Sequence, residues 1–403
     1  MIAVYLSPVY LILCFYVLFR LLVWLEKCYP YLGKKRVRIP VVAVYLFVVF
    51  CILLAFFLEP SPGKRVLKQF SNAWLGVLLN SLLIIGITDV IRLVLKLFSF
   101  PMKEKLFSPK SHAAVGGICM LCVTGLSIWG IRNAEHLQVT DYELYVDKEA
   151  GNLDSLKIIL AADLHMGYSV GVGQIRQMVE QINREDADLV VIAGDIFDNE
   201  YDALEDPEEL AEILAGIRSR YGVYACYGNH DIREKVLAGF TFSGSGEKTS
   251  DPRMDAFLEM AGIRLLREEG VLIEDAFWLY GRPDYSRPGR GIRTRKTPEQ
   301  VTADLDLTKP VIVLDHEPLE LQELADAGVD IDLSGHTHDG QMFPGNVVTG
   351  FLWENSYGYL RKDNMHNVVT SGVGVFGPDM RVGTKSEICR ITVRFRSGGG
   401  PDA

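Results

Sequence analysis

Cysteine is scarce in this sequence, and its placement excludes two classes of site. Seven cysteines occur in 403 residues, five of them within the first 135, and only Cys226 and Cys389 follow. Each of these two stands inside a strand-like apolar run with no second cysteine beside it. We therefore expect neither a disulfide framework nor a zinc–thiolate site.

Positive charge is also in short supply, but only after residue 135. Residues 1–135 hold 15 Lys and Arg against 5 Asp and Glu, a net charge of +10, whereas the remainder holds 26 against 46, a net charge of −20. A phosphate backbone is bound by a basic face, so the acidic second part excludes nucleic acid as the main partner. The apolar fraction of 49% indicates instead that part of the chain lies in a membrane.

Four long apolar segments occupy the first part of the chain. Each is close to the ~20 residues that a helix needs to cross ~30 Å of hydrocarbon, so residues 1–135 are expected to form a region of four transmembrane helices. A cleaved signal peptide followed by buried core helices is disfavoured, because no basic residue precedes Arg20 and three further apolar segments follow the first. The segments are Ile2–Leu25, Val41–Leu58, Ala73–Leu97 and Ala113–Ile131.

The loops between these segments predict an orientation. The first and third loops are the richest in Lys and Arg, so the positive-inside rule places them in the cytoplasm and both termini outside. The chain is then a multi-pass protein of the cell membrane, and its second part is extracytoplasmic. The basic residues are Lys27, Lys34, Lys35, Arg36 and Arg38 in the first loop, Lys64, Arg65 and Lys68 in the second, and Lys103, Lys105 and Lys110 in the third, with Arg92 and Lys96 at the membrane edge of the third.

One acid, Asp89, lies within a predicted span. An intramembrane acid can mark an ion or substrate path, which makes a transporter an alternative. Asp89 stands one helical turn before Arg92 near the cytoplasmic end of its helix, so an ion pair between the two is the favoured interpretation.

From Val139 onward, strand-like and helix-like segments alternate. Such alternation predicts a layered α/β domain over residues 139–396, with 397–403 as a flexible tail. Helical spacing is found over Val172–Asn183 and Pro207–Arg218, and the stretch from Phe343 to Val393 looks strand-rich. The apolar strand segments are Leu156–Ala162, Leu189–Ala193, Val223–Tyr227, Val311–Leu314 and Val329–Leu333.

Polar side chains follow each of these five strands directly. Five of the eight histidines in the chain are among them. Ligands of open α/β sheets bind at the carboxyl ends of the strands, so we expect these side chains to gather at one edge. In order they are Asp163 and His165, Asp195 and Asp198, Asn229 and His230, His316, and His336 and His338.

The chemistry of this set is that of hard or borderline metal ions. Carboxylate and amide oxygens mixed with imidazoles, without thiolates, favour Mn, Fe or Zn. Two such ions ~3.5–4 Å apart can share a hydroxide and stabilise the attacking and leaving oxygens of a phosphoryl group. The pattern therefore predicts dinuclear metal catalysis.

The order of the motifs, D-x-H, G-D-x-x-D, G-N-H-D, a single His and G-H-x-H, resembles the calcineurin-like metallophosphoesterase superfamily from about Leu156 to Val393. The layout with N-terminal spans is similar to the membrane-anchored YkuE and YaeI group. The resemblance implies an α/β fold in which four transmembrane helices precede a layered metallophosphoesterase domain, a β-sandwich flanked by helices.

The resemblance also implies roles for single residues. Asp198 would orient His230, which contacts the phosphate and protonates the leaving oxygen. Asn199 stands where the serine/threonine phosphatase branch has an arginine, so protein phosphatase activity is not supported. The implied cofactors are two divalent ions, Mn, Fe, Zn or Co. Asp163, His165 and His338 would bind one ion, Asn229, His316 and His336 the other, and Asp195 both.

The sequence thus predicts a membrane-anchored phosphoesterase. It would hydrolyse a phosphodiester or phosphomonoester by attack of a metal-bound hydroxide, and its nearness to the membrane favours a lipid-linked substrate. The alternative is a membrane receptor or transporter whose outer domain binds a phosphorylated ligand without turnover.

Three features near the motifs concern the substrate. Gly239–Asp251 reads either as a loop that covers the site or as a surface linker. Arg381 is a candidate for the substrate side. A basic run is interpreted as a solvated loop rather than a phosphate contact, and it consists of Arg282, Arg287, Arg290, Arg293 and Arg295.

Overall fold

The computed structural model describes residues 2–233, 236–237, 240–241, 251–289, 292 and 294–396. It divides into two compact units: Met1–Arg132 with Val236–Gly244 and Gly377–Met380, and the remainder from Asn133 onward. The tail predicted at 397–403 and most of the Gly239–Asp251 loop lie outside the described residues.

The first unit consists mainly of four long helices, each long and apolar enough to cross a membrane. The third begins at a defined cap, because the Ser61 side chain accepts a hydrogen bond from the backbone of Lys64 and Pro62 occupies the first helical position. Short helices η1 (Pro30–Gly33) and α4 (Lys103–Leu106) lie in two of the connections. The long helices are α1 (Ile2–Cys28), α2 (Lys35–Phe57), α3 (Pro62–Leu97) and α5 (Pro109–Glu135).

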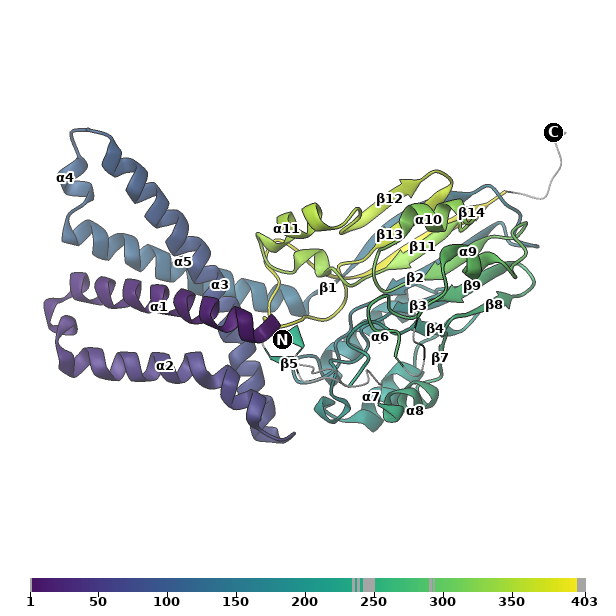
Figure 1. Ribbon diagram of the computed structural model, residues 1–403, viewed down its shortest axis with the longest axis horizontal. Coiled ribbons are helices and arrows are strands. Elements are labelled where there is room, and N and C mark those ends of the chain that lie inside the picture. Colours follow the sequence, from purple (N-terminus) through teal and green to yellow (C-terminus); the bar gives the residue numbers. More distant parts are fainter. Residues whose placement is uncertain are drawn as a thin grey trace. The chain divides into compact units, whose positions relative to one another are not determined.

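The second unit contains two six-stranded sheets (Figure 1). In the first, β2, β3, β4 and β7 are parallel to one another, and β14 is antiparallel to β2. In the second, β9, β10, β11 and β13 are parallel, with antiparallel β8 and β12 at the edges. The first sheet has the order β1 (Leu137–Val146), β14 (Ser386–Phe395), β2 (Ser155–Ala161), β3 (Leu189–Ala193), β4 (Val223–Cys226), β7 (Ile263–Leu265). The second has the order β12 (Gly358–Lys362), β13 (Met365–Val369), β11 (Ile331–Ser334), β10 (Val311–Leu314), β9 (Phe277–Gly281), β8 (Glu269–Ile273). A two-stranded sheet of β5 (Val236–Leu237) and β6 (Phe240–Thr241) belongs to the first unit.

Alternating side chains of β2 divide the core into layers. Ile158 and Leu160 pack into one apolar cluster with Ile312 and Leu314 of the second sheet, so the two sheets face each other. The intervening Ile159 belongs to a different cluster, formed with the helices α6 (Val172–Arg184), α7 (Pro207–Ala215) and α8 (Pro252–Met260). This alternation follows from the two-residue period of a strand.

The outer face of the second sheet is covered by α9 (Pro298–Thr302) and α10 (Leu321–Asp326), whose Val301 and Leu324 pack with Val311 and Val313. The domain is therefore a β-sandwich between two layers of helices (Figure 1). The predicted fold class, four apolar N-terminal helices followed by a layered α/β domain, is confirmed.

The spacing of its apolar residues explains how α6 packs into the core. Its buried side chains are Ile175, Met178, Val179 and Ile182, a spacing that places them on one face of a helix.

One helix was not expected from the sequence. Residues Gly345–Leu352 form α11, within the stretch from Phe343 to Val393 that was expected to be strand-rich. None of the side chains of α11 is buried.

Candidate metal centre

The loops that follow β2 and β3 remain hydrogen-bonded beyond the ends of the strands. The backbone nitrogen of Asp163 donates to the carbonyl of Gly194 at 3.0 Å, and that of His165 donates to the carbonyl of Asp195 at 2.9 Å. These bonds fix the two loops side by side. Backbone hydrogen bonds therefore fix the two loops that carry the predicted side chains.

A further set of bonds joins the two sheets at this edge. The backbone nitrogen of His336, after β11, donates to both carboxylate oxygens of Asp163, at 3.1 and 3.0 Å. The side chain of His316, after β10, contacts the carbonyl of Ala193 through Nδ1 at 2.9 Å. The strand ends of both sheets thus meet in one place.

Asp195 lies at the middle of this cluster. Its Oδ1 accepts a hydrogen bond from the backbone nitrogen of His230 at 2.7 Å. Its Oδ2 is 3.6 Å from Nε2 of His165 and 3.2 Å from Nε2 of His316. A single oxygen is therefore within reach of two separate groups of imidazoles.

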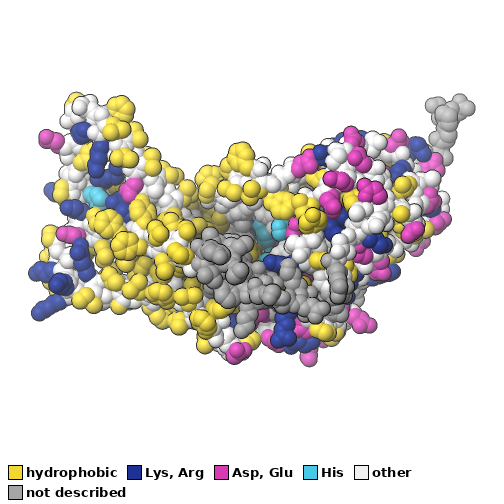
Figure 2. All heavy atoms as spheres, in the orientation of Figure 1, with side chains coloured by type: hydrophobic (Ala, Val, Ile, Leu, Met, Phe, Trp, Pro, Cys, Tyr) yellow, Lys and Arg dark blue, Asp and Glu magenta, His cyan; other side chains and the backbone are white. Residues whose placement is uncertain are grey.

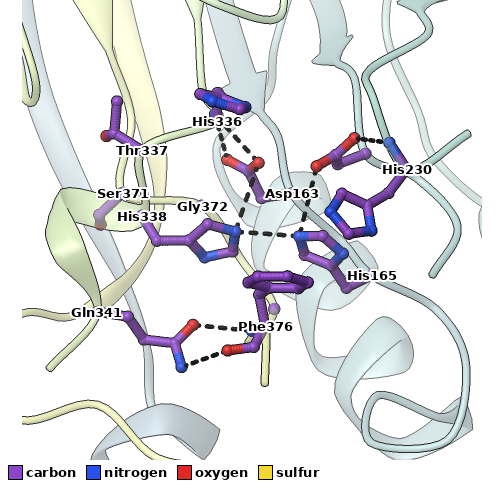
Figure 3. A network of polar contacts seen from close by, with 12 residues as sticks. Asp163, His165, His230, His336, Thr337, His338, Gln341, Ser371, Gly372 and Phe376 are labelled. Carbon is purple, nitrogen blue, oxygen red and sulfur yellow. Dashed lines mark hydrogen bonds and ion pairs between the residues drawn. The ribbon is translucent and has the colours of Figure 1, made fainter. Parts of the chain in front are cut away.

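The first group consists of Asp163, His165 and His338 (Figure 3). The Nε2 atoms of the two histidines are 3.0 Å apart, and Nε2 of His338 is 3.6 Å from Oδ1 of Asp163. These atoms point at a common centre.

The second group consists of Asn229, His316 and His336. Oδ1 of Asn229 is 3.1 Å from Nε2 of His316 and 2.9 Å from Nδ1 of His336, and the two ring nitrogens are 3.2 Å apart. The structure thus brings together all seven residues that the sequence proposes as ligands, in the two sets expected and with Asp195 adjoining both.

The donor set fits a pair of divalent cations. Nδ1 of His316 faces a backbone carbonyl and donates to it, so Nε2 is the nitrogen of this ring that faces the centre. Oxygen and imidazole donors without a thiolate suit Mn, Fe, Zn or Co. The ligand atoms of Asp163, His165 and His338 lie within 4.8 Å of one another, as do those of Asp195, His316 and His336, which is close enough for a shared ion in each set.

Burial and neighbouring charges shift the pKa values of several side chains in this site. Burial lowers the pKa of His165 to about 4 and that of His336 to about 3, so both imidazoles are neutral at pH 7. Burial opposes ionisation of Asp195, but His316 and His230 outweigh it and hold the pKa of that carboxyl well below its usual value. Burial raises the pKa of Asp163 to about 7; His316 opposes this shift and Asp195 adds to it. A cation would relieve the repulsion between the two carboxylates.

Backbone strain is concentrated at the same residues. Five of the seven proposed ligands have positive φ: Asp163 at 53°, His165 at 46°, Asp195 at 49°, His336 at 73° and His338 at 53°. Non-glycine residues in this region cost roughly 1–3 kcal/mol each and persist where the surrounding structure holds them. Strain at several neighbouring ligands indicates a functional site.

His230 lies beside the first group, with its ring centroid 5.0 Å from that of His165. Nδ1 of His230 is 3.6 Å from Oδ1 of Asp198, an ion-pair distance. It lies closer to Oδ1 of Asn199, a fully buried residue whose amide donates to the carbonyl of Ile232 at 3.1 Å. Burial favours the neutral form of His230, but Asp195 and Asp198 outweigh it and raise its pKa.

Asn199 is therefore a site residue whose role the sequence did not predict. It was noted only because it replaces an arginine, and nothing in the local pattern indicated that its side chain turns toward His230. Its φ of 62° allows this orientation.

Phe376 is a second unpredicted residue. Its ring centroid lies 4.7 Å from that of His230 and 5.5 Å from that of His165 (Figure 3). Two hydrogen bonds with the side chain of Gln341 position its backbone, at 2.8 and 3.0 Å. Gln341 lies three residues after the G-H-x-H motif, but only the fold brings residue 376 to it.

Arg381 does not face the substrate side, and this expectation is wrong. Its side chain is fully buried and donates to the carbonyls of Ser371 at 2.6 Å and Gly374 at 2.7 Å. The guanidinium therefore holds the backbone loop that leads to Phe376.

The interpretation of the basic run as a solvated loop is wrong for two of its arginines. Arg282 and Arg295 are buried, and each pairs with Asp315 at 2.9 Å, so they are structural rather than solvated. Arg287 is half-buried and donates through Nη1 to the backbone carbonyl of Asn229 at 3.0 Å. Among the arginines of this run that the structure describes, it is the one that contacts a proposed ligand residue. Arg290 and Arg293 lie outside the described residues.

The comparison with known families agrees with this geometry. Residues 156–340 match the calcineurin-like phosphoesterase family. Residues 156–340 of this chain belong to a calcineurin-like metallophosphoesterase domain. The matched residues include all seven ligands proposed for the centre, and the resemblance inferred from the motifs is confirmed.

Three relatives whose names include a metallophosphoesterase are similar to this chain. A transmembrane protein with a metallophosphoesterase domain from Danio rerio is 30% identical over 69% of this chain and 62% of its own length. An uncharacterized metallophosphoesterase from Aquifex aeolicus is 28% identical over 64% of this chain and 92% of its own. YkuE of Bacillus subtilis, also an uncharacterized metallophosphoesterase, is 24% identical over 64% of this chain and 86% of its own.

The match with the Danio rerio transmembrane protein thus covers less than two thirds of that protein's length. Together with the four apolar helices, this relative indicates that the chain is associated with a membrane.

Proposed function

We propose that this protein is a dinuclear-metal phosphoesterase that hydrolyses a phosphodiester or phosphomonoester. The observation that carries the proposal is the position of Asp195, whose Oδ2 lies 3.6 Å from His165 and 3.2 Å from His316, between two groups of ligand atoms. Such an oxygen is what a pair of ions needs as a common ligand. Bound divalent ions supply Lewis acidity and lower the pKa of coordinated water toward neutrality.

The residues around the ions would perform the rest of the chemistry. His230 has a raised pKa and is held by Asn199 and Asp198, so it can carry the proton that the leaving oxygen requires. Arg287, anchored on the carbonyl of Asn229, supplies a guanidinium for the phosphoryl oxygens. Phe376 covers the rings of His165 and His230 and limits the access of water to them.

Turnover of a soluble ester tests this proposal. The full chain loaded with Mn should hydrolyse bis-p-nitrophenyl phosphate, and Asp195→Asn or His230→Ala should abolish this activity. His366→Gln is the matched control, because His366 is buried in the same domain but contacts Tyr359 and the carbonyl of Tyr145 instead of the cluster. A wild-type protein that stays inactive with Mn, Fe, Zn and Co in turn would refute the enzymatic function and favour a receptor that binds without turnover.

We further propose that the substrate is lipid-linked, and the support comes from α11. Phe351 is 86% exposed and Leu352 is 74% exposed, and exposed Phe343, Val347 and Val348 extend this apolar surface. Hydrophobic side chains gather over α11 in Figure 2. Exposed apolar patches on a domain mark contacts with other apolar matter, here the hydrocarbon of a lipid.

This apolar surface is connected to the site. Trp353 follows α11 directly, and its ring centroid is 5.1 Å from that of His336. An acyl chain lying on α11 would therefore keep its phosphoester near the metal ligands. Hydrolysis of a phospholipid in mixed micelles should fall for Phe351→Glu, whereas equal rates for wild type and variant would contradict the lipid-linked substrate.

We also propose the topology predicted from the loops: residues 1–135 as a multi-pass membrane region, residues 139–396 as the metallophosphoesterase domain, and this domain on the extracytoplasmic side. Protease added to intact cells should digest the domain. Digestion that requires lysis would place it in the cytoplasm.

A further inference from the structure

A cavity of about 320 Å³ lies within the first unit, between the four long helices. Most of its lining is apolar, including Val17 and Leu21 of α1, Val77 and Ile85 of α3, and Met120 of α5. It also has a basic part, formed by Arg20, Arg92 and His112. The combination of hydrocarbon walls and cationic groups is that of a site for an amphiphile.

The charges in this basic part do not balance. Asp89 pairs with Arg20 at 2.6 Å and accepts a hydrogen bond from the hydroxyl of Tyr16 at 2.8 Å. The ion pair expected between Asp89 and Arg92 is therefore wrong. Among the described residues Arg92 has no carboxylate partner, and its guanidinium lies over the ring of Phe107, 5.3 Å from the centroid. The two arginines together with Asp89 leave one net positive charge at the cavity.

A charge in this setting favours an anionic ligand. An arginine within a membrane is costly unless it is paired or reaches the interface. Basic pockets between transmembrane helices bind the headgroups of anionic lipids. The apolar lining next to the arginines provides a place for the acyl chain of the same molecule.

We propose that this cavity binds one anionic phospholipid, with its phosphate beside Arg20 and Arg92 and an acyl chain along Val77 and Ile85. The site lies entirely within the helical unit and is separate from the metal centre. It is independent of the proposed hydrolytic activity.

Native mass spectrometry of the full chain, released from detergent micelles doped with lipid, tests the proposal. Wild type should retain phosphatidylglycerol over phosphatidylcholine by roughly fivefold, the preference that one additional cationic side chain supplies. Arg92→Gln should lose this preference and Arg92→Lys should keep it. Val77→Phe, which fills the cavity, should retain less of either lipid.

The matched control is Arg132→Gln, at an exposed arginine in the last turn of α5 that does not line the cavity. It should retain lipid as the wild type does, and thermal unfolding should show that the variants are folded. Equal retention of the two lipids by wild type, or an unchanged preference in Arg92→Gln, would overturn the proposal. Displacement of phosphatidylglycerol by millimolar inorganic phosphate would also overturn it, because the site would then recognise a free anion.

Discussion

Gly228 is the residue at which a single methyl group should disturb the metal centre most directly. It lies in the turn after β4, and a Cβ at this position would be 2.5 Å from the backbone nitrogen of Asp195, 2.7 Å from Cγ of His316 and closer still to Oδ1 of Asp195. Ordinary contacts of a Cβ begin near 3.4 Å, so Asp195 or His316 must move by about 1 Å in Gly228→Ala.

The size of the effect follows from this displacement. A shift of the groups that position metal ligands typically lowers metal affinity by about 10- to 100-fold, and misplacement of reacting groups by about 1 Å lowers turnover by about 100-fold. We expect Gly228→Ala to show both losses. Mn affinity can be measured by titration with detection of free Mn, and kcat/KM with bis-p-nitrophenyl phosphate.

Gly173→Ala provides the matched control. Gly173 lies in the first turn of α6, and a Cβ there would have no atom within 4 Å. This variant should bind Mn and turn over substrate as the wild type does, with an unchanged or slightly raised unfolding midpoint because alanine favours a helix over glycine. Wild-type Mn affinity and turnover in Gly228→Ala would refute the geometry inferred for Asp195 and His316.

Three further predictions concern the substrate, pH and metal. Arg287→Gln should raise KM for bis-p-nitrophenyl phosphate about tenfold or more with a smaller effect on Mn affinity, because a charge-assisted contact to phosphate is lost; an unchanged KM would exclude Arg287 from substrate binding. Burial, with a contribution from Asp315, raises the pKa of Asp332 to about 7. As the pH rises, this carboxyl therefore ionises in the unfolded chain before it ionises in the folded one. Its contribution lowers the free energy of unfolding progressively from about pH 4 to about pH 7 and stays constant at higher pH, at a few kcal/mol at most. Asp332→Asn should remove that part of the pH dependence of thermal unfolding, and parallel curves for variant and wild type would contradict it. Chelation should lower the unfolding midpoint of the wild type, since ions bind only the folded site, and should do so much less in Asp195→Asn; an equal drop in both would indicate an effect outside this centre.

The strand-end motifs made the metal centre predictable from the sequence. Asp163, Asp195 and Asn229 each follow an apolar run directly, so the pairing of parallel strands is sufficient to bring them together. The same holds for His316 and His336 in the second sheet.

Other features depend on contacts between distant segments, which no local pattern encodes. Phe376 reaches His165 only through the loop that Arg381 and Gln341 hold in place. The pairing of Arg282 with Asp315 buries a residue that looks solvated in a basic run. The helix α11 was missed because glycine, valine and threonine are poor helix formers, so its propensity is weak.

The shared position of Asp195 is the central claim, and electron paramagnetic resonance of the Mn-loaded full chain tests it most directly. Two Mn ions joined through one carboxylate lie ~3.5–4 Å apart, so their spins should couple and give a multiline spectrum at two ions per chain. Asp195→Asn should lose this spectrum, and His366→Gln should keep it. A six-line spectrum of isolated Mn in the wild type, at one ion per chain, would contradict the dinuclear centre.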